Sequence, residues 1–171
     1  MMTTNTEANN EYITGMFSFL KNNYDESIEH LSRAIEIEPD HALAYMSRGS
    51  AFFRSDRLEE AIADFDRAIE LKPDLARSYH LRGLAKERQG NDGEAIADFK
   101  KAIELDPEYG AAYYSRATLH TKMGNEDLAV EDIKIVEHLT NKNVGSFANE
   151  NNVWRSQHMR LESLTAGEVN R

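Results

Sequence analysis

Apolar and small residues recur between residues 42 and 73 at the spacing that places side chains on one face of a helix. They fall into two blocks, Tyr45, Gly49 and Phe52 in the first and Leu58, Ala61, Ile62, Phe65, Ala68 and Ile69 in the second. Asp56 lies between the blocks, and Pro73 ends the second because proline cannot continue a helix. The pattern predicts two antiparallel helices joined by a turn near Asp56.

This pattern repeats every 34 residues, the step from Pro39 to Pro73 (73 − 39) and from Pro73 to Pro107 (107 − 73). Three other sets of residues follow the same step: Gly15, Gly49 and Gly83; Tyr45, Tyr79 and Tyr113; and Ala34, Ala68 and Ala102. A fixed period of this length is typical of stacked repeats. We therefore expect an amino-terminal tail at 1–7 and four helix-turn-helix units, at about 8–41, 42–75, 76–109 and 110–141.

The predicted turns repeat as well, with Asn22, Asp56, Gly90 and Gly124 at equivalent positions. These residue types adopt a left-handed backbone at low cost, so we expect one at each turn. Small residues lie at matching distances on the two sides of the turn, as with Gly83 and Ala95. The two helices of a unit are therefore predicted to approach closely there.

The series of aromatic, glycine, small, aromatic, alanine and proline residues resembles the tetratricopeptide repeat family. It is complete in the second unit (Tyr45, Gly49, Ala61, Phe65, Ala68 and Pro73) and in the third, and it is degraded in the first and fourth, where Asn141 replaces the proline. The resemblance implies an all-α fold, a right-handed superhelical α-solenoid, with no enzymatic activity.

The segment 142–171 is predicted to open with a loop at 142–146 and to continue as a helix with a frayed end. One face of that helix would carry Val153, Trp154, Gln157, Leu161 and Leu164. We expect it to cap the exposed apolar edge of the fourth unit. The alternative is that it occupies the groove of the stack.

The charge and apolar content of the sequence limit the partners and the cell compartment that we expect. The net charge of −10, from 30 acidic and 20 basic residues, argues against nucleic acid and membrane surfaces and favours basic residues in a partner protein. The apolar groove positions described below favour apolar residues in that partner as well. The sequence has no apolar run long enough for a membrane span and no signal-peptide pattern at its start, so we expect a cytoplasmic protein.

No motif in the sequence indicates catalysis. There is no cysteine, no HExxH pair, no phosphate-binding glycine loop and no G-x-S-x-G elbow. Carboxylate pairs such as Asp64 and Asp66 arise easily on acidic helices. We therefore expect no catalytic residues, no metal site and no cofactor.

One charged pattern follows the repeat: Arg48, Arg82 and Arg116, with Asp64, Asp98 and Asp132. Both series skip the first unit, where Thr14 and His30 stand instead. Because each Arg and its Asp lie equally far from the turn, we expect ion pairs within units. The alternative is a basic strip for an acidic ligand.

The resemblance implies a concave groove lined by the first helix of each unit, and a function as an adaptor that binds a partner's peptide there. The corresponding residues are Asn9, Tyr12, Met16, Phe19, Leu43, Met46, Ser50, Phe53, Arg77, His80, Leu84, Glu87, Ala111, Tyr114, Thr118 and Thr121. The amino-terminal half of this set is apolar. The alternative function is a self-assembling structural protein; we expect a monomer, with a homo-oligomer left open.

Some members of this family clamp the acidic carboxyl-terminal tails of heat-shock chaperones with Lys, Asn and Arg side chains. The corresponding positions here hold Tyr12, Met16, Ser47, Arg77 and Leu81. Only Arg77 conforms, so this sequence does not predict chaperone-tail binding.

Overall fold

The computed structural model describes the backbone of residues 2–150 and the side chains of residues 6–142. This part of the chain contains helices and turns and no strand, as expected for an all-α fold. The helices are α1 (Met2–Leu20), α2 (Tyr24–Ile37), α3 (Ala42–Arg54), α4 (Leu58–Leu71), α5 (Ala76–Arg88), α6 (Asp92–Leu105), α7 (Gly110–Lys122) and α8 (Glu126–Glu150).

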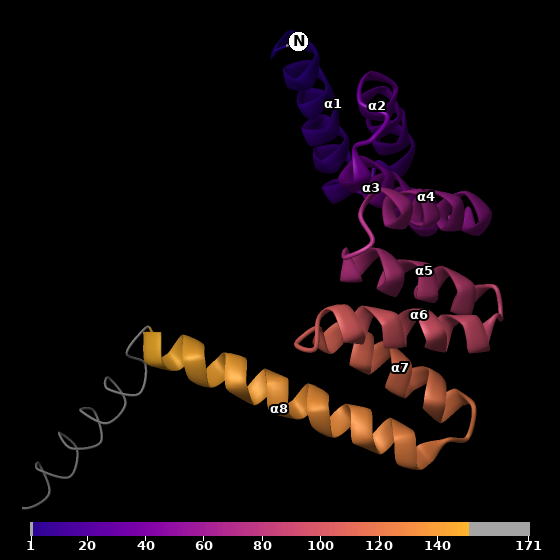
Figure 1. Cartoon of the computed structure of the whole chain (residues 1–171), viewed down its shortest axis with the longest axis vertical. Coiled ribbons are helices and arrows are strands. Elements are labelled where there is room, and N and C mark those ends of the chain that lie inside the picture. Colours follow the sequence, from indigo (N-terminus) through magenta and orange to yellow (C-terminus); the bar gives the residue numbers. More distant parts are fainter. Residues whose placement is uncertain (1, 151–171) are drawn as a thin grey trace, which may run out of the picture.

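The helices pair as consecutive hairpins that stack in chain order (Figure 1). Each second helix packs on the first helix of the next hairpin, and α1, α3, α5 and α7 also contact one another in sequence. Contacts therefore run only between neighbours, which is the organisation of an α-solenoid. The first helices form a continuous row along one side of the stack.

The predicted left-handed turns are confirmed. The φ angles are 63° at Asn22, 61° at Asp56, 83° at Gly90 and 78° at Gly124. Each turn uses a residue that tolerates this region of φ, so the hairpins close with the same geometry although the residue types differ.

The close approach inside the hairpins is also confirmed, and the structure identifies its cause. A Cβ atom added to Gly83 would lie 2.6 Å from Cε1 of Phe99 and 3.2 Å from the carbonyl oxygen of Ala95. At Gly49 the corresponding contact, with the ring of Phe65, is 2.8 Å. Both rings are fully buried, so the glycines make room mainly for the rings.

The ion pairs within units are confirmed. Arg82 donates two hydrogen bonds to Asp98, at 2.9 and 2.6 Å, and equivalent pairs join Arg48 to Asp64 and Arg116 to Asp132. The hydrogen bond to Asp64 raises the pKa of Arg48. Arg82 also donates to Asp66 of the preceding unit at 2.6 Å, so this arginine joins two units as well as two helices.

Two predicted boundaries are wrong. The chain is helical from Met2, where an amino-terminal tail at 1–7 was expected, because neither Gly nor Pro interrupts α1 before Gly15. The expected loop at 142–146 lies inside α8. Asn141 stands where prolines follow the other second helices, and the single Gly145 costs only about 1 kcal/mol in a helix.

The remaining expectations for the tail concern Val153, Trp154, Gln157, Leu161 and Leu164. These residues lie outside the described part of the chain.

Candidate functional site

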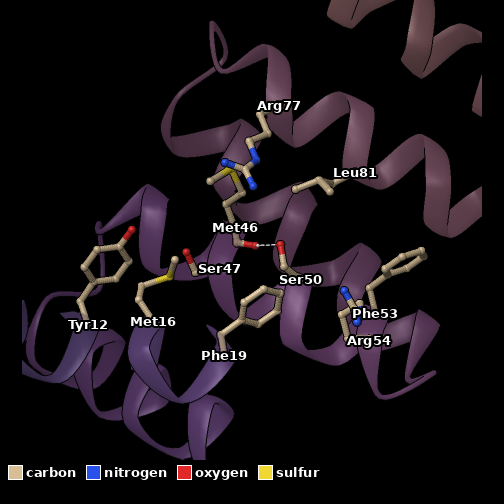
Figure 2. A pocket seen from close by; sticks show the side chains of 10 residues that line it. All are labelled: Tyr12, Met16, Phe19, Met46, Ser47, Ser50, Phe53, Arg54, Arg77 and Leu81. Atoms are coloured by element: carbon tan, nitrogen blue, oxygen red, sulfur yellow. Dashed lines mark hydrogen bonds between the residues drawn. The ribbon is translucent and has the colours of Figure 1, made fainter. Parts of the chain in front are cut away.

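A pocket of about 340 Å³ opens where the first helices of the first three hairpins meet (Figure 2). Its lining comes from α1 (Tyr12, Met16 and Phe19), α3 (Met46, Ser47, Ser50, Phe53 and Arg54) and α5 (Arg77 and Leu81). The pocket therefore draws on residues far apart in sequence that the stacking of three units brings together.

The repeat explains how these side chains come to share one cavity. Tyr12, Met16 and Phe19 are spaced by four and three residues and so lie on one helix face. The same positions one period later hold Met46, Ser50 and Phe53 on α3. Two neighbouring helices thus contribute equivalent faces to the same pocket.

Most of the pocket wall is apolar and rests on the core. Met46 is only 8% exposed, and Phe53 and Leu81 pack against the buried cluster that contains Phe65. The Ser50 hydroxyl donates a hydrogen bond to the Met46 carbonyl oxygen at 2.8 Å (Figure 2). The Ser50 proton is therefore satisfied by the backbone of its own helix. The wall is held in place by packing, and it offers thioether and aromatic surface to a ligand.

Comparison with known proteins identifies the fold family. A family model described as "Tetratricopeptide repeat" matches residues 21–76, and one described as "TPR repeat" matches residues 88–124. The chain belongs to the tetratricopeptide repeat family. Among curated proteins none matches its sequence. Its family and fold make it a protein-interaction module.

Solved tetratricopeptide structures share this architecture. A crystal structure of MamA is 27% identical, with a TM-score of 0.75, and the match covers 81% of each chain. The first TPR of Spaghetti (RPAP3) bound to the HSP90 peptide SRMEEVD is 24% identical over 70% of this chain and 94% of that one, with a TM-score of 0.67. The Arabidopsis OM64 TPR domain is 22% identical over 70% and 98%, with a TM-score of 0.68.

The tetratricopeptide groove positions expected from the sequence divide into two sets. The pocket is lined by three positions from each of the first two units and one from the third: Tyr12, Met16, Phe19, Met46, Ser50, Phe53 and Arg77. The rest lie outside its lining: Asn9, Leu43, His80, Leu84, Glu87, Ala111, Tyr114, Thr118 and Thr121.

His80 is a structural residue, contrary to its expected place on an open groove. It is 7% exposed, and its Nδ1 and Nε2 atoms lie 2.9 Å from the hydroxyls of Tyr109 and Ser115 respectively. Burial, with a smaller contribution from the charge of Arg77, lowers the pKa of His80 from its usual 6.5 to about 4. The imidazole is therefore neutral near pH 7 and joins the third unit to the fourth. Leu84 likewise packs against a buried cluster, the one that contains Phe99.

Every position of the chaperone-tail clamp lines this pocket: Tyr12, Met16, Ser47, Arg77 and Leu81. The pocket therefore lies where the chaperone-tail clamp of other family members lies, but most of the clamp's polar side chains are apolar residues here. Ser47 and Leu81 are not among the groove positions that the family resemblance implies. Arg54 was missed altogether, because the groove pattern ends at Phe53 and does not count a long side chain that reaches in from the next position.

The charged residues that line the pocket, Arg54 and Arg77, are both positive. Arg54 and Arg77 are both exposed, and the lining contains no carboxylate. The Arg54 guanidinium carbon lies 5.4 Å from the centre of the Tyr24 ring. A largely apolar cavity that also carries two cations can accept a ligand with both apolar and anionic groups.

The described side chains offer no site for metal chemistry. No group of three or more His, Asp or Glu residues among them is arranged to hold a metal ion. Among the described helices, none has the length and apolar character needed to cross a membrane.

Proposed function

We propose that this protein is a non-enzymatic adaptor that holds a peptide segment of a partner protein in the pocket between α1, α3 and α5. The observation that carries the proposal is the largely apolar wall provided by Met16, Phe19, Met46 and Phe53. Ligand sites are typically concave, preformed and mostly apolar, with a few polar groups that fix orientation. The HSP90 peptide bound to the first TPR of Spaghetti supports the use of such a stack for a peptide.

The pocket can be blocked at Ser50, which is half-buried and lines the cavity. Phenylalanine at this position would fill part of the cavity and compete with a ligand side chain. Thr118 occupies the equivalent position two periods later (50 + 34 + 34) and is exposed outside the pocket. Thr118→Phe is therefore a matched control for Ser50→Phe.

The experiment selects peptides from a random dodecapeptide library on the full-length protein and measures their affinity by calorimetry. We expect Ser50→Phe to weaken binding of the selected peptides at least about tenfold, a loss of about 1.4 kcal/mol, and Thr118→Phe to leave it unchanged. Thermal unfolding of both variants checks that they fold. As a second test, Phe19→Ser removes the aromatic side chain that α1 contributes to the pocket wall. Equal affinity for the parent and both pocket variants would contradict the proposal.

A second candidate function, self-assembly, is supported by the two ends of the stack. Phe17 is 60% exposed, whereas the equivalent Ala51, on a helix that packs against the preceding unit, is fully buried. At the other end Ile133 is 44% exposed, whereas the equivalent Phe99 is fully buried. Both ends thus present the type of surface that joins units inside the stack, and copies joined head to tail would cover it.

Light scattering over a concentration series tests this alternative. If the protein self-assembles, the mass of the parent particles should grow with concentration. The Phe17→Glu variant should then keep the monomer mass. A constant monomer mass at all concentrations would exclude it and leave the adaptor.

A further inference from the structure

The arginines of the described side chains divide into paired and unpaired groups, and the division coincides with the pocket. Each arginine between residues 6 and 142 that lies outside the pocket forms a salt bridge with a carboxylate: Arg33, Arg48, Arg57, Arg67, Arg82, Arg88 and Arg116. Among these described residues, Arg54 and Arg77 form neither a salt bridge nor a side-chain hydrogen bond, and both line the pocket. In a chain with 30 acidic residues, unpaired guanidinium groups gathered at one cavity favour an anionic ligand.

The repeat explains why Arg54 has no partner. Its equivalent one period later, Arg88, lies 3.7 Å from Asp56, the turn residue of the preceding unit. The turn residue at the matching place before Arg54 is Asn22, which carries no charge. The neutral turn therefore leaves the guanidinium at the pocket without an ion pair, while the ring of Tyr24 lies against it.

Arg77 has no evident role in the fold. It is the second residue of α5, where a cation is disfavoured by the positive end of the helix dipole. The equivalent positions hold Asn9, Leu43 and Ala111, so no described unit repeats the cation. Figure 2 shows the guanidinium groups of Arg77 and Arg54 well apart, with pocket-lining side chains between them.

We propose that the pocket binds a peptide segment with one large apolar side chain flanked by carboxylates. The apolar side chain lies against Met16, Phe19 and Phe53, and the carboxylates on its two sides pair with Arg54 and Arg77. The net charge of −10 would predict a basic partner, but pairing depends on the charges within a few ångströms, and those at the pocket are positive. This inference rests on the proposed function and specifies the chemistry of its ligand.

Synthetic nonapeptides with blocked termini test the charge directly. Each has a central Phe in a Gly/Ser background, flanked on both sides by Glu, by Gln or by Lys, and a fourth peptide replaces the central Phe of the Glu form with Ala. We expect the Glu peptide to bind the full-length protein at least about tenfold more tightly than the Gln peptide, as befits charge-assisted hydrogen bonds. The Lys peptide should bind most weakly, and loss of the central Phe should weaken the Glu form.

The arginines are tested by Arg54→Gln and Arg77→Gln, with Arg67→Gln as the control, since Arg67 is an exposed arginine on α4 paired with Glu70. Each pocket variant should weaken the Glu peptide about tenfold, leave the Gln peptide unchanged and reduce the salt dependence of binding. The control should bind all peptides as the parent does. Because both pocket arginines are exposed, the variants should fold normally.

Three results would overturn the inference. The first is equal or tighter binding of the Gln or Lys peptide, and the second is an unchanged affinity for the Glu peptide in both arginine variants. The third is no binding of any of these nonapeptides while library peptides still bind in a way that Ser50→Phe blocks. In each case the ligand chemistry is wrong and the adaptor function stands. Failure of the adaptor function itself would be recognised separately, by library peptides that are insensitive to Ser50→Phe.

Discussion

Met46 and His80 occupy equivalent positions on α3 and α5, one period apart, and are buried to almost the same extent, at 8% and 7% exposure. Met46 makes no side-chain hydrogen bond and forms part of an open pocket. His80 has a hydroxyl partner at each ring nitrogen and connects its unit to the next. One repeat position therefore supports two uses: an apolar side chain leaves surface for a ligand, and a polar one joins neighbouring units.

The largest effect expected from this comparison is a dependence of stability on pH. Between pH 6.5 and about 4 the unfolded chain binds a proton at His80 that the folded chain does not. Stability from this residue is therefore fully present above pH 6.5 and is lost as the pH falls towards 4, by up to about 3 kcal/mol.

Chemical denaturation at a series of pH values measures this loss. His80→Met, which gives the third unit the residue of the second, should unfold with a flatter pH profile than the parent in this window. It should also be less stable at pH 7 by about 1–3 kcal/mol, because the partly buried hydroxyls of Tyr109 and Ser115 lose their partner. His138→Gln, at an exposed site, should keep the parent profile. Parallel profiles for the parent and His80→Met would show that folding does not lower the pKa of His80.

The next effect concerns the hairpin that carries His80. Gly83→Ala would place a methyl group 2.6 Å from the Phe99 ring, which is also in contact with His80 at 5.7 Å between ring centroids. We expect a loss of about 1–3 kcal/mol, as for other overpacked cores. Gly93→Ala, where an added Cβ has nothing within 4 Å, should be neutral or slightly stabilising. Equal unfolding midpoints for the two variants would refute the close approach.

The smallest effect separates the two partners of Arg82. The Asp98 side chain is 7% exposed, whereas that of Asp66 is 48% exposed. Double-mutant cycles should therefore give a coupling energy with Asp98 above about 1 kcal/mol and a smaller one with Asp66, where solvent screens the pair. The reverse order would mean that Arg82 joins units more strongly than it joins the helices of its own unit.

The repeat made much of this architecture predictable, because period, turns and close contacts follow from residue types at fixed spacing. Asn22 and Asp56 could be placed in left-handed turns from sequence, and the pairing of Arg48 with Asp64 followed from equal distances to a turn. The continuation of α8 through the expected loop at 142–146 could not be predicted, because with Asn141 in place of proline no residue there dictates a stop.

The site was less predictable than the fold. Family positions located the apolar residues such as Met16 and Phe53. They did not reveal that His80 lies between the hydroxyls of Tyr109 and Ser115. Tyr109 immediately precedes α7 and Ser115 lies on it, so their contacts with His80 depend on the stacking of two hairpins. The unpaired state of Arg54 likewise depends on which turn residue lies beside it in space.

Mapping a bound peptide by NMR tests most directly whether the pocket between α1, α3 and α5 is the binding surface. The full-length protein is titrated with a library-selected peptide, and the shifts of the backbone amides are followed. We expect the largest changes at residues around Met16, Ser50 and Arg77, with amides around Thr118 unchanged. Largest changes on α7, or on the second helices of the hairpins, would contradict it.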